Sequence, residues 1–304
     1  MIFDRKVFVL GGPTGSGKSS LALHFATHHQ SILINGDSLQ LYKELPILTA
    51  HPTLEDMRRT PHSLYSVLTA EDTSTAGLWA RLAAVEIKKA WEEDTLPVVV
   101  GGTGFYLKSL LDGLSPIPDV SKEVRETGRD LLRKKGLLAF FKEVQEIDPI
   151  LAKRISPNDT QRLLRAWEVF HATKKPLSTW QKIPPVSLLP EASFIKIFIQ
   201  LNKEDLKERI AQRAKWMLSH GAVEEVKKLQ TQNIPENHPL KKALGIRAIE
   251  CLIRGDVSFE TCFDEMVKQT VQYAKRQLTW FRHQFKDAIM LDGTINIEKV
   301  LYLK

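Results

Sequence analysis

Short, continuous hydrophobic runs alternate with longer segments of helical periodicity over much of the chain. A strand that is buried on both faces has such a run, because neither of its sides meets water. The pattern predicts strands at residues 6–10, 31–35, 64–68, 97–100 and 193–200, and a weaker one at 288–291. Alternation of this kind is typical of an α/β fold in which helices cover both faces of a parallel sheet. Ligands bind such a sheet beyond the carboxyl ends of its strands.

The same pattern predicts helices around these strands. One follows a cap at Ser74 or Thr75 and runs through Glu93. Its apolar stripe is predicted at Leu78, Leu82, Val85 and Trp91. Four more helices follow the fifth strand, at residues 203–219, 222–232, 240–254 and 259–284.

The alternation stops between residues 115 and 190, where the pattern predicts helices only. They are expected at 120–135, 137–146, 149–155 and 159–173, the last one capped by Asn158. Proline-rich segments at 115–118 and 183–190 bound this region, and such segments favour connections over helices. We therefore expect an α/β core at 1–116 and 191–304 and an all-helical insertion at 117–190.

Positive charge concentrates in the predicted insertion. The whole chain has a net charge of +7, and residues 119–182 contain 14 Lys or Arg against 9 Asp or Glu. This excess indicates a polyanionic partner such as nucleic acid. Because no apolar run approaches the roughly 20 residues that span a bilayer, we expect no membrane segment, no signal peptide and a cytoplasmic location. Cys251 and Cys262 lack metal-site spacing and are expected to be reduced thiols.

The first predicted strand leads into the sequence GPTGSGKS, which a predicted helix at 19–26 follows. This octapeptide matches the G-x-x-x-x-G-K-[ST] phosphate-binding loop at every constrained position. Its glycines let backbone N–H groups point at an anion, and the positive end of the following helix adds to the attraction. Lys18 supplies a cation and Ser19 a hydroxyl that binds magnesium. The expected phosphate-binding residues are Gly12, Pro13, Thr14, Gly15, Ser16, Gly17, Lys18 and Ser19.

Two further loops follow strands at the same edge of the sheet. Asp37, after the second strand, fits a magnesium ligand or acceptor-activating group in a kinase, a base that deprotonates an amine in an alkyl transferase, or a turn residue. Thr103 lies in the sequence GGTG after the fourth strand, where glycines allow close approach of a ligand. That strand does not end in the aspartate with which a hydrolysing NTPase binds magnesium, which counts against a motor or switch.

Two predicted helices present basic residues on one face. Arg209 and Arg213 are four residues apart, so they either grip a diphosphate together or form ion pairs in solvent. In the insertion, Gln161, Arg162 and Arg165 form a polar edge suited to contacts with phosphates or a base.

Together these motifs resemble those of the tRNA dimethylallyltransferases, which add an isoprenoid group to the adenosine immediately 3′ of the anticodon. The matching segments are residues 12–19, 37–42, 49–52, 100–104, 156–162, 209–218, 243–247 and 275–280, so the resemblance extends over nearly the whole chain. The sequence departs from the family pattern at Leu48, His51 and Ile246, where glycine, lysine and tyrosine are usual. These departures concern tRNA contacts or the size of the allyl pocket.

The resemblance implies a P-loop NTPase-like core with a tRNA-binding helical insertion, acting as a monomer on the anticodon stem-loop. It implies that the phosphate loop holds dimethylallyl diphosphate with Mg²⁺ at Ser19. Asp37 would be the general base on adenine N6, Thr103 would position that amine, and Arg213 would stabilise the departing diphosphate. The tRNA contacts that it implies are Asp37, Ser38, Leu39, Gln40, Thr103, Arg125, Gln161, Arg162, Leu163, Leu164, Arg165, Lys242, Ala243, Leu244, Gly245, Ile246 and Arg247.

The function expected on this basis is transfer of a dimethylallyl group to the N6 amine of that adenosine, with release of diphosphate. The nearest alternative is a small-molecule kinase that binds ATP at the same loop and uses the insertion as a lid. A non-catalytic RNA-binding ATP switch is the third reading, and it would tolerate the loss of Asp37. Dependence on dimethylallyl diphosphate and tRNA, with ATP absent, distinguishes the first function from the second.

Overall fold

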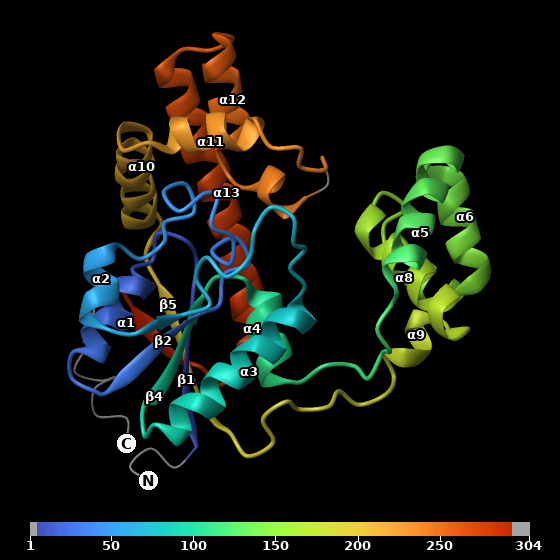
Figure 1. Cartoon of the computed structure of the whole chain (residues 1–304), viewed down its shortest axis with the longest axis horizontal. Coiled ribbons are helices and arrows are strands. Elements are labelled where there is room, and N and C mark those ends of the chain that lie inside the picture. The colour runs from blue at the N-terminus through green and yellow to red at the C-terminus, as the bar shows by residue number, and fades with distance from the viewer. Residues whose placement is uncertain (1–4, 237, 294–304) are drawn as a thin grey trace. The chain divides into compact units, whose positions relative to one another are not determined.

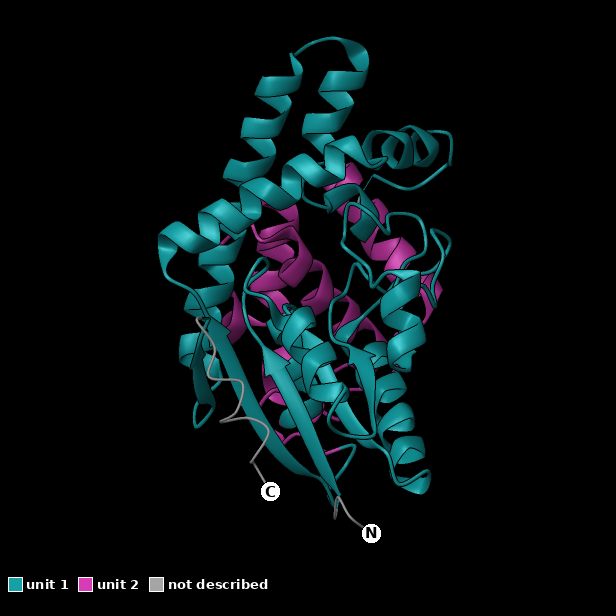
Figure 2. Cartoon of the chain, turned by 90° about the vertical axis from the view of Figure 1, so that its left-hand side faces the viewer, with its two compact units in different colours: residues 1–111, 188–304 teal, residues 112–187 magenta. Residues whose placement is uncertain are grey.

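The computed structural model describes residues 5–236 and 238–293 (Figure 1). The chain forms two compact units, one of residues 1–111 and 188–304 and the other of residues 112–187 (Figure 2). The insertion predicted from the sequence runs from 117 to 190. Each unit has a hydrophobic core of its own.

Among the residues described, six strands form one sheet in the first unit. They are β1 Lys6–Gly11, β2 Ser31–Asn35, β3 His62–Ser63, β4 Leu96–Gly101, β5 Ser193–Gln200 and β6 Ile289–Asp292. Their order is β3-β2-β4-β1-β5-β6, and every neighbouring pair is parallel. The predicted α/β fold with a parallel sheet is confirmed. The loops that follow β1, β2 and β4 therefore leave the sheet at one edge.

Helices cover both faces of this sheet (Figure 1). On one face, Phe25 of α1 (Lys18–Ala26) packs into a core with alternate strand residues such as Phe8. On the other face lie α3 (Ala76–Glu92), α4 (Gly104–Leu111) and α13 (Phe259–Gln284), and Phe281 of α13 stacks on Phe198 of β5 with ring centroids 5.2 Å apart. The unit also contains α2 Leu54–Arg59, α10 Lys203–Ser219, α11 Ala222–Gln230, a 3₁₀ helix at Pro239–Lys242 and α12 Ile246–Arg254. In the described part of the chain, no helix is both long and apolar enough to cross a membrane.

The strand predicted at residues 64–68 is wrong, because the third strand is the two-residue β3 just before it. Leu64 and Ser66 have φ angles of +63° and +54°, which an extended strand does not accommodate. Leu64 is nevertheless buried, and its carbonyl oxygen accepts a hydrogen bond from Asn35 Nδ2 at 2.9 Å. The apolar run thus reflects the burial of a loop.

The apolar stripe predicted for α3 is confirmed at Trp91, which is buried, and is wrong at Val85. Val85, placed in the predicted stripe, is 61% exposed, and the buried face is formed by Trp79, Ala83, Ile87 and Trp91. The predicted cap is confirmed at Thr75, whose hydroxyl accepts from Leu78 N at 3.1 Å. The single helix predicted at 240–254 is wrong, because Gly245 interrupts it with a φ of +89°.

The second unit is all-helical. It contains α5 Lys122–Lys135, α6 Leu137–Ile147, α7 Pro149–Ala152, α8 Thr160–Thr173 and α9 Leu177–Trp180, the last of which the sequence pattern did not predict. Phe140, Leu163 and Trp167 are central to its core. Asp159, and not Asn158 as predicted, caps α8 by accepting from Arg162 N at 3.1 Å.

Asp148 joins two short helices of this unit. It is 1% exposed, and its two carboxylate oxygens accept from Leu151 N at 3.0 Å and from Ser178 N at 2.8 Å. Replacing it with alanine leaves both buried N–H groups without these partners, so the free energy of unfolding should fall by about 3 kcal/mol. Asp159→Ala, which removes a more exposed cap, should cost about 1 kcal/mol. Urea unfolding of both variants measures the difference, and equal losses would contradict the role of Asp148.

Candidate active site

The phosphate loop joins β1 to α1, and its backbone requires glycine at several positions. Gly15 and Gly17 have φ angles of +81° and +90°, which side-chain-bearing residues rarely adopt. A Cβ atom at Gly12 would lie 2.5 Å from the carbonyl oxygen of Ile199 in β5. The glycines of the motif therefore allow the backbone conformation and the close approach that the loop requires, as the sequence predicts.

Lys18 is partly buried in this loop. Its Nζ donates to the carbonyl oxygen of Pro13 at 2.7 Å. Burial lowers the pKa of Lys18 to about 7, the negative charge of Asp37 opposes this shift, and the positive charge of Arg213 adds to it. A bound polyanion would favour the protonated form. The nearby hydroxyl of Ser16 is fully buried and has no hydrogen-bond partner among the described residues, so the loop also contains an unused donor.

Arginine side chains from α10 reach the phosphate loop. Arg213 Nη1 donates to Thr14 Oγ1 at 3.1 Å, and burial lowers its pKa while Asp37 opposes that shift. A Cβ atom at Gly17 would meet Arg209 Nη1 at 3.1 Å, although Arg209 is otherwise exposed. Of the two interpretations of this pair, the approach to a diphosphate site fits the geometry, because neither arginine forms an ion pair among the described residues.

Asp37 is fixed beside these cations by the buried side chain of Asn35. Asn35 Oδ1 accepts from Asp37 N at 2.7 Å, and Asn35 Nδ2 donates to the Asp37 carbonyl at 2.9 Å. One carboxylate oxygen of Asp37 accepts from Leu39 N at 3.0 Å. The negative charge of Asp37 raises the pKa values of both Lys18 and Arg213, so the carboxylate is close enough to act on them electrostatically.

Three tyrosines lie within reach of the same charge. Burial raises the pKa values of Tyr65, Tyr106 and Tyr273, that of Tyr106 to about 12, and Asp37 raises all three further. Their hydroxyls therefore remain protonated at neutral pH. A carboxylate near such phenols and cations can accept a proton from a bound amine.

Thr103 connects the third loop to the second. Its Oγ1 accepts from Ser38 N at 3.0 Å, directly after Asp37 in the chain. A Cβ atom at Gly101 would overlap the backbone of Gly36, so the two loops approach each other as closely as backbone allows. The structure thus brings Lys18, Asp37, Thr103 and Arg213 together from loops and a helix far apart in the sequence.

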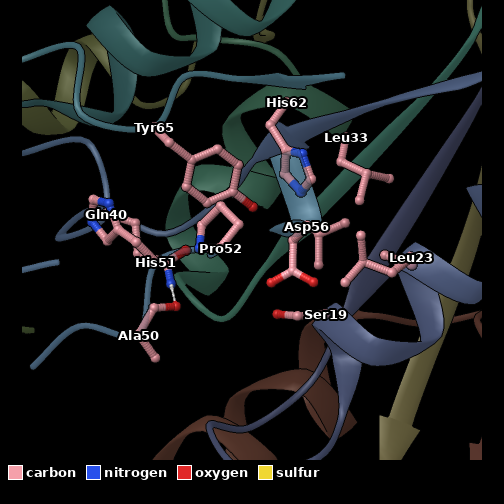
Figure 3. A pocket seen from close by; sticks show the side chains of 12 residues that line it. Ser19, Leu23, Leu33, Gln40, Ala50, His51, Pro52, Asp56, His62 and Tyr65 are labelled. Atoms are coloured by element: carbon pink, nitrogen blue, oxygen red, sulfur yellow. Dashed lines mark hydrogen bonds between the residues drawn. The ribbon is translucent and has the colours of Figure 1, made fainter. Parts of the chain in front are cut away.

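A small pocket, open to solvent, adjoins the phosphate loop at Ser19. Figure 3 shows the side chains of Ser19, Asp56, His62 and Tyr65 around it. His51, which stands where lysine is usual in the resembling family, also lines it, and burial lowers the pKa of His51 to about 4. This histidine is therefore neutral at pH 7 and does not replace the missing cation.

The residues implied to contact tRNA differ in their exposure. In the second unit, Gln161 and Arg162 are exposed, Arg125, Leu164 and Arg165 are partly exposed, and Leu163 lies in the hydrophobic core. In the first unit, Lys242 and Arg247 are exposed, whereas Ala243, Gly245 and Ile246 are buried. The buried side chains among them support the surrounding backbone, and the exposed cations are accessible to phosphates, although Arg162 also pairs with Asp159 at 3.2 Å.

Sequence reasoning did not assign a role to two residues of the site. Asn35 holds Asp37, and Gln277 of α13 hydrogen-bonds to two of the loops, accepting from Thr14 N at 2.9 Å and donating to the Gly102 carbonyl at 2.8 Å. The position of Asn35 two residues before Asp37 was one signal. The only signal for Gln277 was its place in the matching segment 275–280, because its partners lie 263 and 175 residues away.

Comparison with known proteins assigns the chain to a family. Residues 40–284 match the IPP transferase family. The chain belongs to this family. The family match begins after the phosphate loop and Asp37. A relative that aligns with 99% of this chain extends the similarity to those residues. Tyr65, Thr103, Arg213 and Gln277 lie within the matched range.

Curated relatives of this chain carry the name tRNA dimethylallyltransferase. The protein of that name from Paramagnetospirillum magneticum is 39% identical over 276 residues, which cover 91% of this chain and 87% of the relative. The one from Rhodospirillum centenum is 39% identical over 300 residues, covering 99% and 96%. These alignments confirm the family resemblance.

Solved structures of similar proteins confirm the fold of this chain. The full-length tRNA isopentenylpyrophosphate transferase from Bacillus halodurans has a TM-score of 0.68 and 27% identity, covering 98% of this chain and 93% of that one. A eukaryotic dimethylallyltransferase acting on tRNA has a TM-score of 0.76 and 26% identity, covering 95% and 74%. The core is therefore a P-loop NTPase-like α/β fold.

Proposed function

We propose that the protein transfers the dimethylallyl group of dimethylallyl diphosphate to the N6 amine of the adenosine that follows the tRNA anticodon. The observation that carries the proposal is that the carboxylate of Asp37 acts electrostatically on the partly buried cations Lys18 and Arg213, in a chain of the IPP transferase family. The relatives named above are tRNA dimethylallyltransferases. Neither they nor the family match support the kinase alternative.

The arrangement suits a displacement at the allylic carbon. The N6 amine attacks C1 of the dimethylallyl group, a C–N bond forms, and the C–O bond breaks with its electron pair leaving on the diphosphate oxygen. Asp37 accepts the proton that the amine loses, while Thr103 holds the neighbouring loop in place. Lys18, Arg213 and the backbone N–H groups of the loop stabilise the negative charge that develops on the leaving group. The adenine must leave its stack to reach these residues.

We propose that Mg²⁺ binds with the diphosphate and uses the hydroxyl of Ser19 as a protein ligand. Among the described residues, no group of three or more His, Cys, Asp or Glu side chains could hold a metal ion. Mg²⁺ often keeps several waters and binds mainly through substrate phosphates, so a site with few protein ligands fits it. The ion would supply further positive charge to the leaving diphosphate.

We propose that exposed basic residues of both units bind the tRNA. The candidates are Arg162 and Arg125 in the helical unit, and Lys242 and Arg247 in the α/β unit. The helical unit contains most of the excess positive charge of the chain, because its basic residues outnumber its acidic ones. Contacts with the phosphates of the anticodon stem-loop position the RNA, and they weaken as salt concentration rises.

The proposal is tested by incubating the protein with unmodified tRNA, MgCl₂ and radiolabelled dimethylallyl diphosphate, followed by digestion to nucleosides. We expect the label in N6-substituted adenosine and one diphosphate released per label incorporated, with ATP absent. Phosphoryl transfer from ATP to a small molecule, together with no labelled nucleoside, would contradict it. tRNA that lacks an adenosine after the anticodon serves as the control substrate and should remain unlabelled.

A further inference from the structure

The side chain of Gln277 lies buried between two loops of the site. It is 6% exposed and projects from α13, the long helix on one face of the sheet. Its Oε1 accepts from Thr14 N in the phosphate loop at 2.9 Å, and its Nε2 donates to the carbonyl oxygen of Gly102 at 2.8 Å. The reverse orientation of the amide would set donor against donor and acceptor against acceptor, so the partners fix its orientation.

Both partners of Gln277 lead to residues of the proposed chemistry. The hydroxyl of Thr14 accepts from Arg213 Nη1 at 3.1 Å, on the side of the leaving diphosphate. Gly102 precedes Thr103, whose hydroxyl accepts from Ser38 N at 3.0 Å, next to Asp37. A series of hydrogen bonds and short backbone links thus joins the loop that holds the diphosphate to the loop that holds the base, and Gln277 is its centre.

Helix α13 also packs closely against the backbone of these segments. A Cβ atom at Gly102 would lie 2.5 Å from Gln277 Nε2, and one at Gly104 would overlap the ring of Trp280. A Cβ atom at Gly11 would overlap the ring of Phe281. The glycine that ends β1 and the glycines that follow β4 therefore let one face of α13 approach both segments closely, and Gln277 is the residue of that face that hydrogen-bonds to both loops.

We propose that Gln277 is a positioning residue that fixes the spacing between the phosphate loop and the loop of Thr103 during prenyl transfer. The proposal rests on the proposed function. In-line displacement needs the allylic carbon and the amine at near-contact distance, and a misplacement of about 1 Å can cost about 100-fold in rate. A buried glutamine that served stability alone would affect unfolding and leave the rate of transfer unchanged.

The test compares Gln277→Leu, which keeps the approximate volume and removes both hydrogen bonds, with the wild-type protein. We expect the single-turnover rate to fall by about 10- to 100-fold, while KM for dimethylallyl diphosphate and for tRNA changes by less than about threefold. Gln269→Leu on the same helix is the control, because Gln269 Nε2 bonds only locally, to Glu265 at 2.9 Å, and should leave the rate unchanged. A wild-type rate in Gln277→Leu would overturn the proposal.

A second variant covers the case in which Gln277→Leu fails to fold. Gln277→Glu keeps the size and the acceptor for Thr14 N but sets a carboxylate oxygen against the Gly102 carbonyl. We expect it to lose about 10-fold or more in rate, and a folded variant with the wild-type rate would overturn the proposal as well.

A readout independent of catalysis separates this proposal from the proposed function. Hydrogen exchange is measured at the amides of residues 101–104 with and without inorganic diphosphate. We expect diphosphate to slow exchange there in the wild-type protein, because Gln277 connects this loop to the phosphate loop, and to have little effect in Gln277→Leu. Equal protection in both proteins would overturn the positioning role, whether or not the wild-type protein modifies tRNA.

Discussion

Replacement of Asp37 by alanine should lower the rate of prenyl transfer by about 10²- to 10⁴-fold, the range typical for loss of a general base. The reason is the place of the carboxylate beside Lys18 and Arg213, at the end of β2. Affinity for tRNA should change little, because the exposed cations that we propose bind phosphates are elsewhere in the chain. Single-turnover transfer and filter binding of tRNA measure the two quantities separately.

Asp37→Asn is the matched variant, because the amide keeps the size and the acceptor for Leu39 N but is not a base. It should lose nearly as much rate as Asp37→Ala. Thermal unfolding of both variants checks that the loop survives the change, since Asp37 also offsets two partly buried positive charges. Unimpaired transfer in either folded variant would eliminate the assignment of Asp37.

Replacement of Arg213 by alanine should lower the rate by about 10²- to 10³-fold, as expected when one donor to a developing negative charge is removed. Arg213 is held at Thr14 and is partly buried, so its charge acts on the diphosphate with less screening than in open water. Rapid-quench measurements with saturating dimethylallyl diphosphate report the chemical step.

Two residues of the same helix calibrate this result. Arg209 also approaches the phosphate loop but is exposed, so Arg209→Ala should have a smaller effect, about 10-fold or less. Lys207 is exposed, and Lys207→Ala should leave the rate unchanged while altering the net charge by the same amount. Equal losses in all three variants would mean that charge alone, without geometry, is responsible.

The parts of the fold that depend on local pattern could be predicted from the sequence. Each residue of the phosphate loop can be assigned from the sequence, because its glycines are needed for the backbone conformation and its lysine and serine for binding phosphate and metal. Helices α10 and α13 have the predicted bounds, since each begins at a capping residue, Asn202 and Ser258, that accepts from the third residue of the helix.

The failures arise where tertiary contacts override local pattern. Leu64 and Val85 are both apolar, yet one is buried in a loop with positive φ and the other is exposed on α3. The core there is filled by Trp79 and small alanines instead. Gln277 could not be assigned, because a buried amide shows no pattern along the chain and its partners are set by the packing of α13.

The place of the helical unit within the chain has a consequence for synthesis. Strand β1 is the central strand of the sheet, but its neighbour β5 begins at Ser193, after the whole of residues 112–187. A nascent chain therefore carries β1 with one edge of unpaired backbone N–H and C=O groups while the ribosome completes an entire helical unit. The catalytic sheet closes only late in translation, and until then its first strand relies on β4 alone for pairing.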